Sequence, residues 1–199
     1  MNKSVDYFFA PQSPWTYLGH ERIAAIAAKA DAAIRVMPVD LGRVFPVSGG
    51  LPLPKRAPQR QAYRLTELKR FSEHLQLPMN IQPKYFPVGG DDAAKLIIAV
   101  DLHDSAEQAM RLASAIQKAC WVEERDIASE TTLAEILLSL GLPAQRITQA
   151  QQQAVQQRYD TNTQRAIDAG VFGAPTYIVG GEMFWGQDRL DFVERKLMS

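Results

Sequence analysis

The feature that most constrains the fold is a short apolar run that leads through a proline-flanked turn into a helix. Val5 to Phe9 has the length and apolar character of a buried strand, and Pro11 ends it. We expect Ser13 to cap the following helix and Pro14 to begin it, because proline suits a first turn. The free N–H groups of that turn favour an anion just beyond Ser13, such as a phosphate, carboxylate or thiolate. An ordinary capped helix is the alternative interpretation.

The next residues complete a strand–helix–strand unit. A helix is predicted from Pro14 to Ala30, because apolar residues recur there at helical spacing. Ala33 to Asp40 alternates apolar and polar residues as a strand does, with Pro38 at its end or edge. Strands joined in this way are parallel, with a right-handed crossover.

The middle of the chain is predicted to be a loop followed by helices. Residues 41–58 are rich in glycine and proline, and loops of that length are often functional. A basic helix is expected over residues 59–75, where we interpret most cations, Arg64 included, as a solvated face. Ser105 and Gln108 have the form of a capping box. Further helices are predicted over residues 91–100, 105–123, 130–140, 143–157 and 160–169.

The C-terminal segment returns to strand chemistry. Residues 176–179 and 182–185 are predicted to form a β-hairpin around Gly180 and Gly181, which supply the positive φ values of a tight turn. A C-terminal helix follows residue 189. The whole order, βαβ, helices, then αββα, predicts an α/β protein with a thioredoxin fold interrupted by a large all-helical insertion. We assign residues 1–45 and 158–199 to the thioredoxin-like domain and 46–157 to the helical domain.

Composition excludes several classes of partner. Acidic and basic residues number 22 each, so no polyanion such as nucleic acid is implied. We expect no signal peptide and no membrane-spanning segment. The single cysteine, Cys120, excludes an internal disulfide and a cysteine-based metal cluster; it is interpreted as a small buried apolar residue in a cytoplasmic protein. His20, His74 and His103 lack metal-ligand spacing, and we expect solvated positions for them and no metal site.

Three motifs together carry a family resemblance. Ser13-Pro14-Trp15-Thr16 resembles the Cys-Pro-x-Cys site of thioredoxin-fold oxidoreductases with a hydroxyl replacing each thiol, which argues against dithiol chemistry. Together with residues 172–176 and 185–190, it makes the chain resemble the 2-hydroxychromene-2-carboxylate isomerase and kappa-class glutathione transferase family. That family is a DsbA-like branch of the thioredoxin superfamily, and the resemblance spans the full length.

The resemblance implies a glutathione site. Ser13 matches the serine whose hydroxyl donates a hydrogen bond to the glutathione sulfur. Pro175 matches the cis-proline that leaves the Ala174 backbone free to pair with the cysteinyl part of glutathione. Gln187 and Asp188 match the residues that hold the γ-glutamyl end.

The resemblance leaves the glycyl end less completely specified. Arg60 falls where the family usually has a lysine facing the glycyl carboxylate. The family often has an asparagine in the loop corresponding to residues 48–54, and this sequence has none there.

The implied reaction uses the thiol of glutathione as the nucleophile. A helix N-terminus lowers a thiol pKa from its ordinary value of about 8.5, so a thiolate is expected at neutral pH. Reversible addition to 2-hydroxychromene-2-carboxylate, or to its ring-opened form, would allow bond rotation and release of trans-o-hydroxybenzylidenepyruvate, a step of aromatic catabolism. The candidate aromatic walls of the substrate pocket are Trp15, Tyr85, Phe86 and Trp185, and the candidate cation is Arg43. For each aromatic residue, packing in the core is the alternative interpretation.

Two other functions remain open. One is a kappa-like glutathione transferase that acts on another electrophile, because the glutathione motifs do not specify the second substrate. The other is a non-catalytic protein that holds a peptide or thiol ligand on the cis-proline edge. For the isomerase, the expected partners are glutathione, a small aromatic carboxylate and, from the resemblance, a second copy of the chain in a homodimer.

Overall fold

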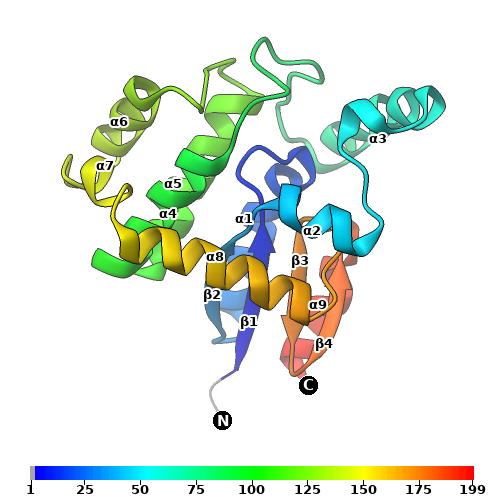
Figure 1. Cartoon of the computed structure of the whole chain (residues 1–199). Coiled ribbons are helices and arrows are strands. Elements are labelled where there is room, and N and C mark those ends of the chain that lie inside the picture. The colour runs from blue at the N-terminus through cyan, green and yellow to red at the C-terminus, as the bar shows by residue number, and fades with distance from the viewer. Residues whose placement is uncertain (1–2) are drawn as a thin grey trace.

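The computed structural model describes residues 3–199 and is built on a four-stranded sheet with strand order β2-β1-β3-β4 (Figure 1). Strands β1 (Ser4–Phe9) and β2 (Ala33–Pro38) are parallel. Strands β3 (Thr176–Val179) and β4 (Glu182–Trp185) form the predicted hairpin, and β3 lies antiparallel to β1. The first strand is therefore central, between one partner near it in sequence and one from the far end of the chain.

Helices lie between these strands in the sequence and follow the last of them. Ser13 caps α1 and Ser105 caps α5, both as predicted: each side chain accepts a hydrogen bond from the N–H three residues later. The helices are α1 (Pro14–Lys29), α2 (Leu41–Ser48), α3 (Pro58–Leu75), α4 (Asp91–His103), α5 (Ala106–Trp121), α6 (Glu130–Ser139), α7 (Arg146–Gln149), α8 (Gln153–Asp168) and α9 (Leu190–Met198), with 3₁₀ turns η1 (Leu53–Lys55) and η2 (Gln187–Arg189).

Both faces of the sheet are buried. Along β1, Val5, Tyr7 and Phe9 point into a large core that also receives side chains from α1, α4, α5 and α9. Phe8 points to the opposite face, into a smaller core shared with α2 and α8, as the two-residue period of a strand requires. The βαβ unit, the hairpin and the intervening helices confirm the predicted thioredoxin fold with its helical interruption.

The domain division stays a prediction. One core is continuous from the sheet into α4, α5 and α6. The boundary predicted at residue 157 falls within α8, and the first two residues of the 1–45 unit lie outside the described chain.

Two predicted segments are wrong. Residues 41–48 form α2 instead of a loop, because Asp40 caps the helix through Gly42 N at 2.7 Å and Val44 is buried in the smaller core. Residues 153–168 form one helix where two were predicted. No glycine or proline interrupts residues 157–160, and the chain turns instead at residues 150–152.

The prediction of a solvated His20 is also wrong. This side chain is 2% exposed, between the sheet and α5. Its Nε2 bonds the carbonyl of Met110 at 2.9 Å, and its Nδ1 lies 3.1 Å from the Tyr7 hydroxyl. Because a carbonyl can only accept, Nε2 donates and Nδ1 accepts from Tyr7. Burial lowers the pKa of His20, so a neutral imidazole fits this position.

Cys120 is buried as predicted, and burial raises the pKa of its thiol to about 12. Its sulfur therefore stays protonated and unreactive at neutral pH. None of the helices in the described part of the chain combines the length and apolar character needed to cross a membrane.

Candidate functional site

Two adjoining clefts open at the N-terminus of α1. We name the first the α3 cleft; it has a volume of about 510 Å³ and includes Gln187 and Asp188 in its lining. The second, the α2 cleft, has a volume of about 710 Å³ and includes Ser13, Phe45 and Phe86. The residues that line both clefts are Trp15, Arg56, Arg60, Arg64, Ala174 and Trp185. Residues from the two ends of the chain and from its middle thus meet around one opening.

Ser13 is the N-cap residue of α1, at the end of the short turn that follows β1. Its Oγ accepts a hydrogen bond from Thr16 N at 3.3 Å, which uses one lone pair and fixes the hydroxyl at the helix mouth. Within residues 3–199 this hydroxyl donates to no acceptor, and the backbone N–H of Trp15 likewise has no partner. Two hydrogen-bond donors and the positive end of a sixteen-residue helix therefore serve the same position.

Ala174 presents free backbone next to that position. The Ala174–Pro175 peptide bond is cis, as predicted. Pro175 O accepts from Gly186 N at 2.9 Å, and Gly173 O accepts from the Thr176 hydroxyl at 2.7 Å, so both sides of the bend are held. Across residues 3–199, neither the N–H nor the C=O of Ala174 makes a hydrogen bond. Ala174 therefore offers one donor and one acceptor to an extended ligand.

Gln187 and Asp188 line the α3 cleft at the turn that follows β4. Gly186 begins this turn with φ +103°, a conformation that favours glycine. Gln187 is buried, and Arg22 Nη1 donates to its Oε1 at 2.7 Å and to its backbone oxygen at 3.0 Å. The Asp188 carboxylate is half-exposed; Arg189 bonds its Oδ2 at 2.7 Å and leaves Oδ1 available. Asp188 can thus accept from a bound ammonium group.

Three arginines line both clefts from the side of α3. Arg60 and Arg64 are four residues apart in α3 and so lie on one face of it, and Arg56 precedes the helix and lines the same clefts. None of them forms an ion pair with a carboxylate in residues 3–199, although Arg56 Nε donates to Leu51 O at 2.8 Å. Arg60 is exposed, whereas Arg64 is partly buried, which corrects the expected solvated position of Arg64. The shared wall is therefore a cationic surface with unused donors.

Aromatic side chains form the apolar part of the clefts. Trp15 makes an edge contact with Phe71 of α3, with ring centroids 6.1 Å apart. Trp185 packs on Phe172 at 4.8 Å, and Phe86 packs on the buried Trp121 at 4.7 Å. These contacts bring three of the four predicted aromatic walls, Trp15, Phe86 and Trp185, to the clefts.

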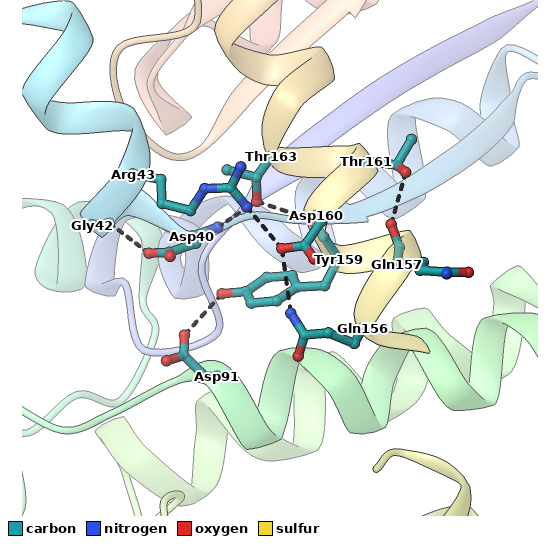
Figure 2. Close-up of polar contacts among 10 residues, drawn as sticks. All are labelled: Asp40, Gly42, Arg43, Asp91, Gln156, Gln157, Tyr159, Asp160, Thr161 and Thr163. Carbon is teal, nitrogen blue, oxygen red and sulfur yellow. Dashed lines mark hydrogen bonds and ion pairs between the residues drawn. The ribbon is translucent and has the colours of Figure 1, made fainter. Parts of the chain in front are cut away.

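The structure does not bring Tyr85 and Arg43 to either cleft. The Tyr85 ring is exposed and lies beside Lys84. Arg43 Nη1 lies 2.8 Å from Asp160 Oδ1, and Figure 2 shows its guanidinium directed at this carboxylate on α8. Arg43 thus ties α2 to α8, with its charge already paired.

The same region holds α2 against the rest of the fold (Figure 2). The Thr163 hydroxyl accepts from Asp40 N at 3.0 Å at the start of α2, and Tyr159 donates to Asp91 at 2.9 Å at the start of α4. Through α2, these contacts on α8 position the wall of the α2 cleft that contains Phe45.

Several site features were not predicted from sequence. Arg22, on α1, has no local signal because its partner Gln187 is 165 residues away. Phe45 was missed with α2, for which Asp40 before an apolar pattern was the available signal. Phe172 lies in the motif at residues 172–176, but only the structure shows that it contacts Trp185. Among the residues that the structure describes, no group of three His, Cys, Asp or Glu could hold a metal ion.

Comparisons with known proteins agree with this architecture. The DSBA-like thioredoxin domain family matches residues 4–198. The 2-hydroxychromene-2-carboxylate isomerase of Pseudomonas putida is 28% identical over 96% of this chain and 92% of its own length. Glutathione S-transferase kappa 1 of Caenorhabditis elegans is 26% identical over 95% of this chain and 88% of its own.

A solved structure of a 2-hydroxychromene-2-carboxylate isomerase is also similar, with a TM-score of 0.80 and 27% identity, covering 96% of this chain and 93% of that one. The match thus includes both the sheet and the helices between its two halves. The chain belongs to the DSBA-like thioredoxin domain family, and the predicted resemblance to 2-hydroxychromene-2-carboxylate isomerases and kappa-class glutathione transferases is confirmed.

Proposed function

We propose that this protein is a glutathione-dependent isomerase that interconverts 2-hydroxychromene-2-carboxylate and trans-o-hydroxybenzylidenepyruvate. The proposal depends on two hydrogen-bond donors at the N-terminus of α1 that have no acceptor in residues 3–199, the Ser13 hydroxyl and the backbone N–H of Trp15. The unpaired backbone of Ala174 lies beside them. Isomerase-named relatives that match nearly the whole chain support the reaction type.

The residues present fit glutathione. The unpaired N–H and C=O of Ala174 suit the backbone of its cysteinyl residue. Asp188 Oδ1 suits the γ-glutamyl ammonium group, and Arg22 holds Gln187 in place for the same end. Arg60, exposed at the rim, suits the glycyl carboxylate. These groups lie along the α3 cleft and end at Ser13 in the neighbouring cleft.

Bound glutathione supplies a thiolate nucleophile that adds reversibly to a conjugated substrate. Ser13 stabilises this negative charge by donating its O–H, while its cap bond to Thr16 N keeps the hydroxyl oriented. The Trp15 N–H and the dipole of α1 favour the charged form further. Phe172, Trp185 and Phe86 provide apolar surface for an aromatic ring and exclude water from the reacting carbon.

The experiment begins with a calorimetric titration of the protein with reduced glutathione. Asp188→Ala is expected to weaken binding about tenfold, because it removes a partly exposed charged hydrogen bond. Asp191→Ala is the matched control, since Asp191 is a nearby exposed carboxylate on α9 outside both clefts. 2-Hydroxychromene-2-carboxylate is then supplied with and without glutathione. Turnover that persists after glutathione is removed would refute the proposal.

A kappa-like glutathione transferase is the second candidate, and the similarity to the Caenorhabditis elegans enzyme favours it. The two functions differ in their product balance. An isomerase returns all the glutathione after each turnover, whereas a transferase converts it to a conjugate. Measuring free thiol during the reaction distinguishes the two.

A further inference from the structure

Among the arginines that line the clefts in residues 3–199, Arg64 is the one with an enclosed guanidinium nitrogen that has no hydrogen-bond partner. Its guanidinium lies over the Phe86 ring at 5.1 Å and 6.0 Å from the Trp121 ring. Its Nη2 is enclosed and has no hydrogen-bond partner, and the neighbouring Trp121 Nε1 is enclosed and unpaired as well. By contrast, the buried Arg146 forms two 2.8 Å bonds with Asp104. Arg64 therefore has the cost of burial without the carboxylate that ordinarily offsets it.

The surroundings of Arg64 suit an incoming anion. Burial, and next the positive charge of Arg56, lower the pKa of Arg64 to about 10. Arg56 is itself partly buried and bonded only to a backbone oxygen, so its remaining N–H groups are also unused. A carboxylate placed here would relieve the repulsion and accept from a planar, two-pronged donor. The site thus selects for a small anion with a flat apolar body.

The position of Arg64 separates it from the expected glutathione contacts. Arg60, one turn earlier on the same helix face, is exposed at the rim. Arg64 lies deeper, against Phe86, which lines the α2 cleft together with Ser13 but not the α3 cleft. An anion that contacts both Arg64 and Phe86 therefore lies in the α2 cleft with Ser13, whereas Asp188 and Gln187 line only the α3 cleft.

We propose that Arg64, assisted by Arg56, binds the carboxylate of the second substrate while Phe86 supports its aromatic or conjugated body. This inference rests on the proposed function, because it assumes that glutathione lies along the α3 cleft with its sulfur at Ser13. It assigns the substrate cation to α3 in place of Arg43, whose guanidinium is paired with Asp160.

The test uses trans-2-hydroxycinnamate, an aromatic carboxylate, and its neutral carboxamide as calorimetric probes, each with and without reduced glutathione. We expect the wild-type protein to bind the acid at least about tenfold more tightly than the amide, as a charged hydrogen bond implies. Arg64→Leu should remove this preference while leaving amide and glutathione affinity unchanged. Arg64→Lys should retain part of the preference. Arg70→Leu, on the same helix but outside both clefts, should behave as wild type.

The outcomes separate this inference from the proposed function. Equal affinity of the wild-type protein for acid and amide, or no binding of either, overturns the role of Arg64. So does a preference that survives in a folded Arg64→Leu protein, or a loss of glutathione affinity in that variant, which would assign Arg64 to glutathione. Acid binding that depends on Arg64 in a protein that binds no glutathione would instead refute the isomerase proposal and leave the anion site standing.

Discussion

Replacing Ser13 with alanine separates its two roles, as a helix cap and as a donor to sulfur. The cap bond to Thr16 N is 3.3 Å long, and its loss costs about 1 kcal/mol of stability. The O–H bond to a thiolate is charge-assisted, and such bonds contribute about 1.5–3 kcal/mol. At 1.36 kcal/mol per pKa unit, Ser13→Ala should raise the pKa of the bound thiol by about 1–2 units.

Ser105 provides the matched control. It caps α5 through the N–H of Gln108 at 3.1 Å and lines neither cleft. Ser105→Ala should therefore lose about 1 kcal/mol of stability, as Ser13→Ala does, without any change in the bound thiol. A variant that is equally destabilised but fully active shows that loss of a cap alone does not impair function.

The assay follows the ultraviolet absorbance of the thiolate as the pH of each protein–glutathione complex is varied. Urea unfolding of the same proteins measures the cap. We expect isomerisation by Ser13→Ala at neutral pH to fall about 10- to 100-fold, in line with the energy of the lost bond. A thiol pKa in Ser13→Ala equal to that in Ser105→Ala would refute the assignment of Ser13 as donor.

Three further predictions concern stability, glutathione binding and pH. Arg146→Ala should lower the free energy of unfolding by about 3 kcal/mol in urea titrations, because Asp104 loses a two-pronged, largely buried partner; an effect under about 1 kcal/mol would contradict this. Gly186→Ala should weaken glutathione binding, since a Cβ at φ +103° would lie 2.5 Å from a carboxylate oxygen in the site; Gly181→Ala, at φ +82° with open space, should leave affinity unchanged. The wild type should lose stability as pH falls below about 6.5, because the pKa of buried His20 is lowered and the unfolded chain takes up the proton first. Thermal unfolding at several pH values should show a flatter profile for His20→Gln, and identical profiles would exclude this role.

Local patterns were sufficient for the elements that local chemistry specifies. The Ser13 cap, the β-hairpin and the Ser105 cap depend on residues within a few positions of one another, so the sequence predicts them. The α2 helix was missed because its glycine and proline content outweighed the cap at Asp40, and its stability comes from packing on α8.

The cleft cations could not be ranked from sequence for a different reason. Arg43 and Arg64 have the same side chain, and each follows a helix start. What distinguishes them is that Asp160 reaches Arg43, whereas no carboxylate in the described chain reaches Arg64. Pairing of this kind depends on tertiary contacts between distant segments. The positions of the candidate glutathione residues could be predicted only because the family resemblance supplied them.

The central position of β1 has a consequence for synthesis of the protein. β1 leaves the ribosome before the other strands, but its partner β3 begins at Thr176, so one edge of an apolar strand stays unpaired while residues 10–175 are translated. At bacterial and eukaryotic elongation rates this interval is roughly 10–30 s, long compared with the folding of the helices. During that time Tyr7, Phe8 and Phe9 border an unpaired edge that can recruit another nascent chain. The helices made in between can shield this strand until the hairpin arrives and closes the sheet.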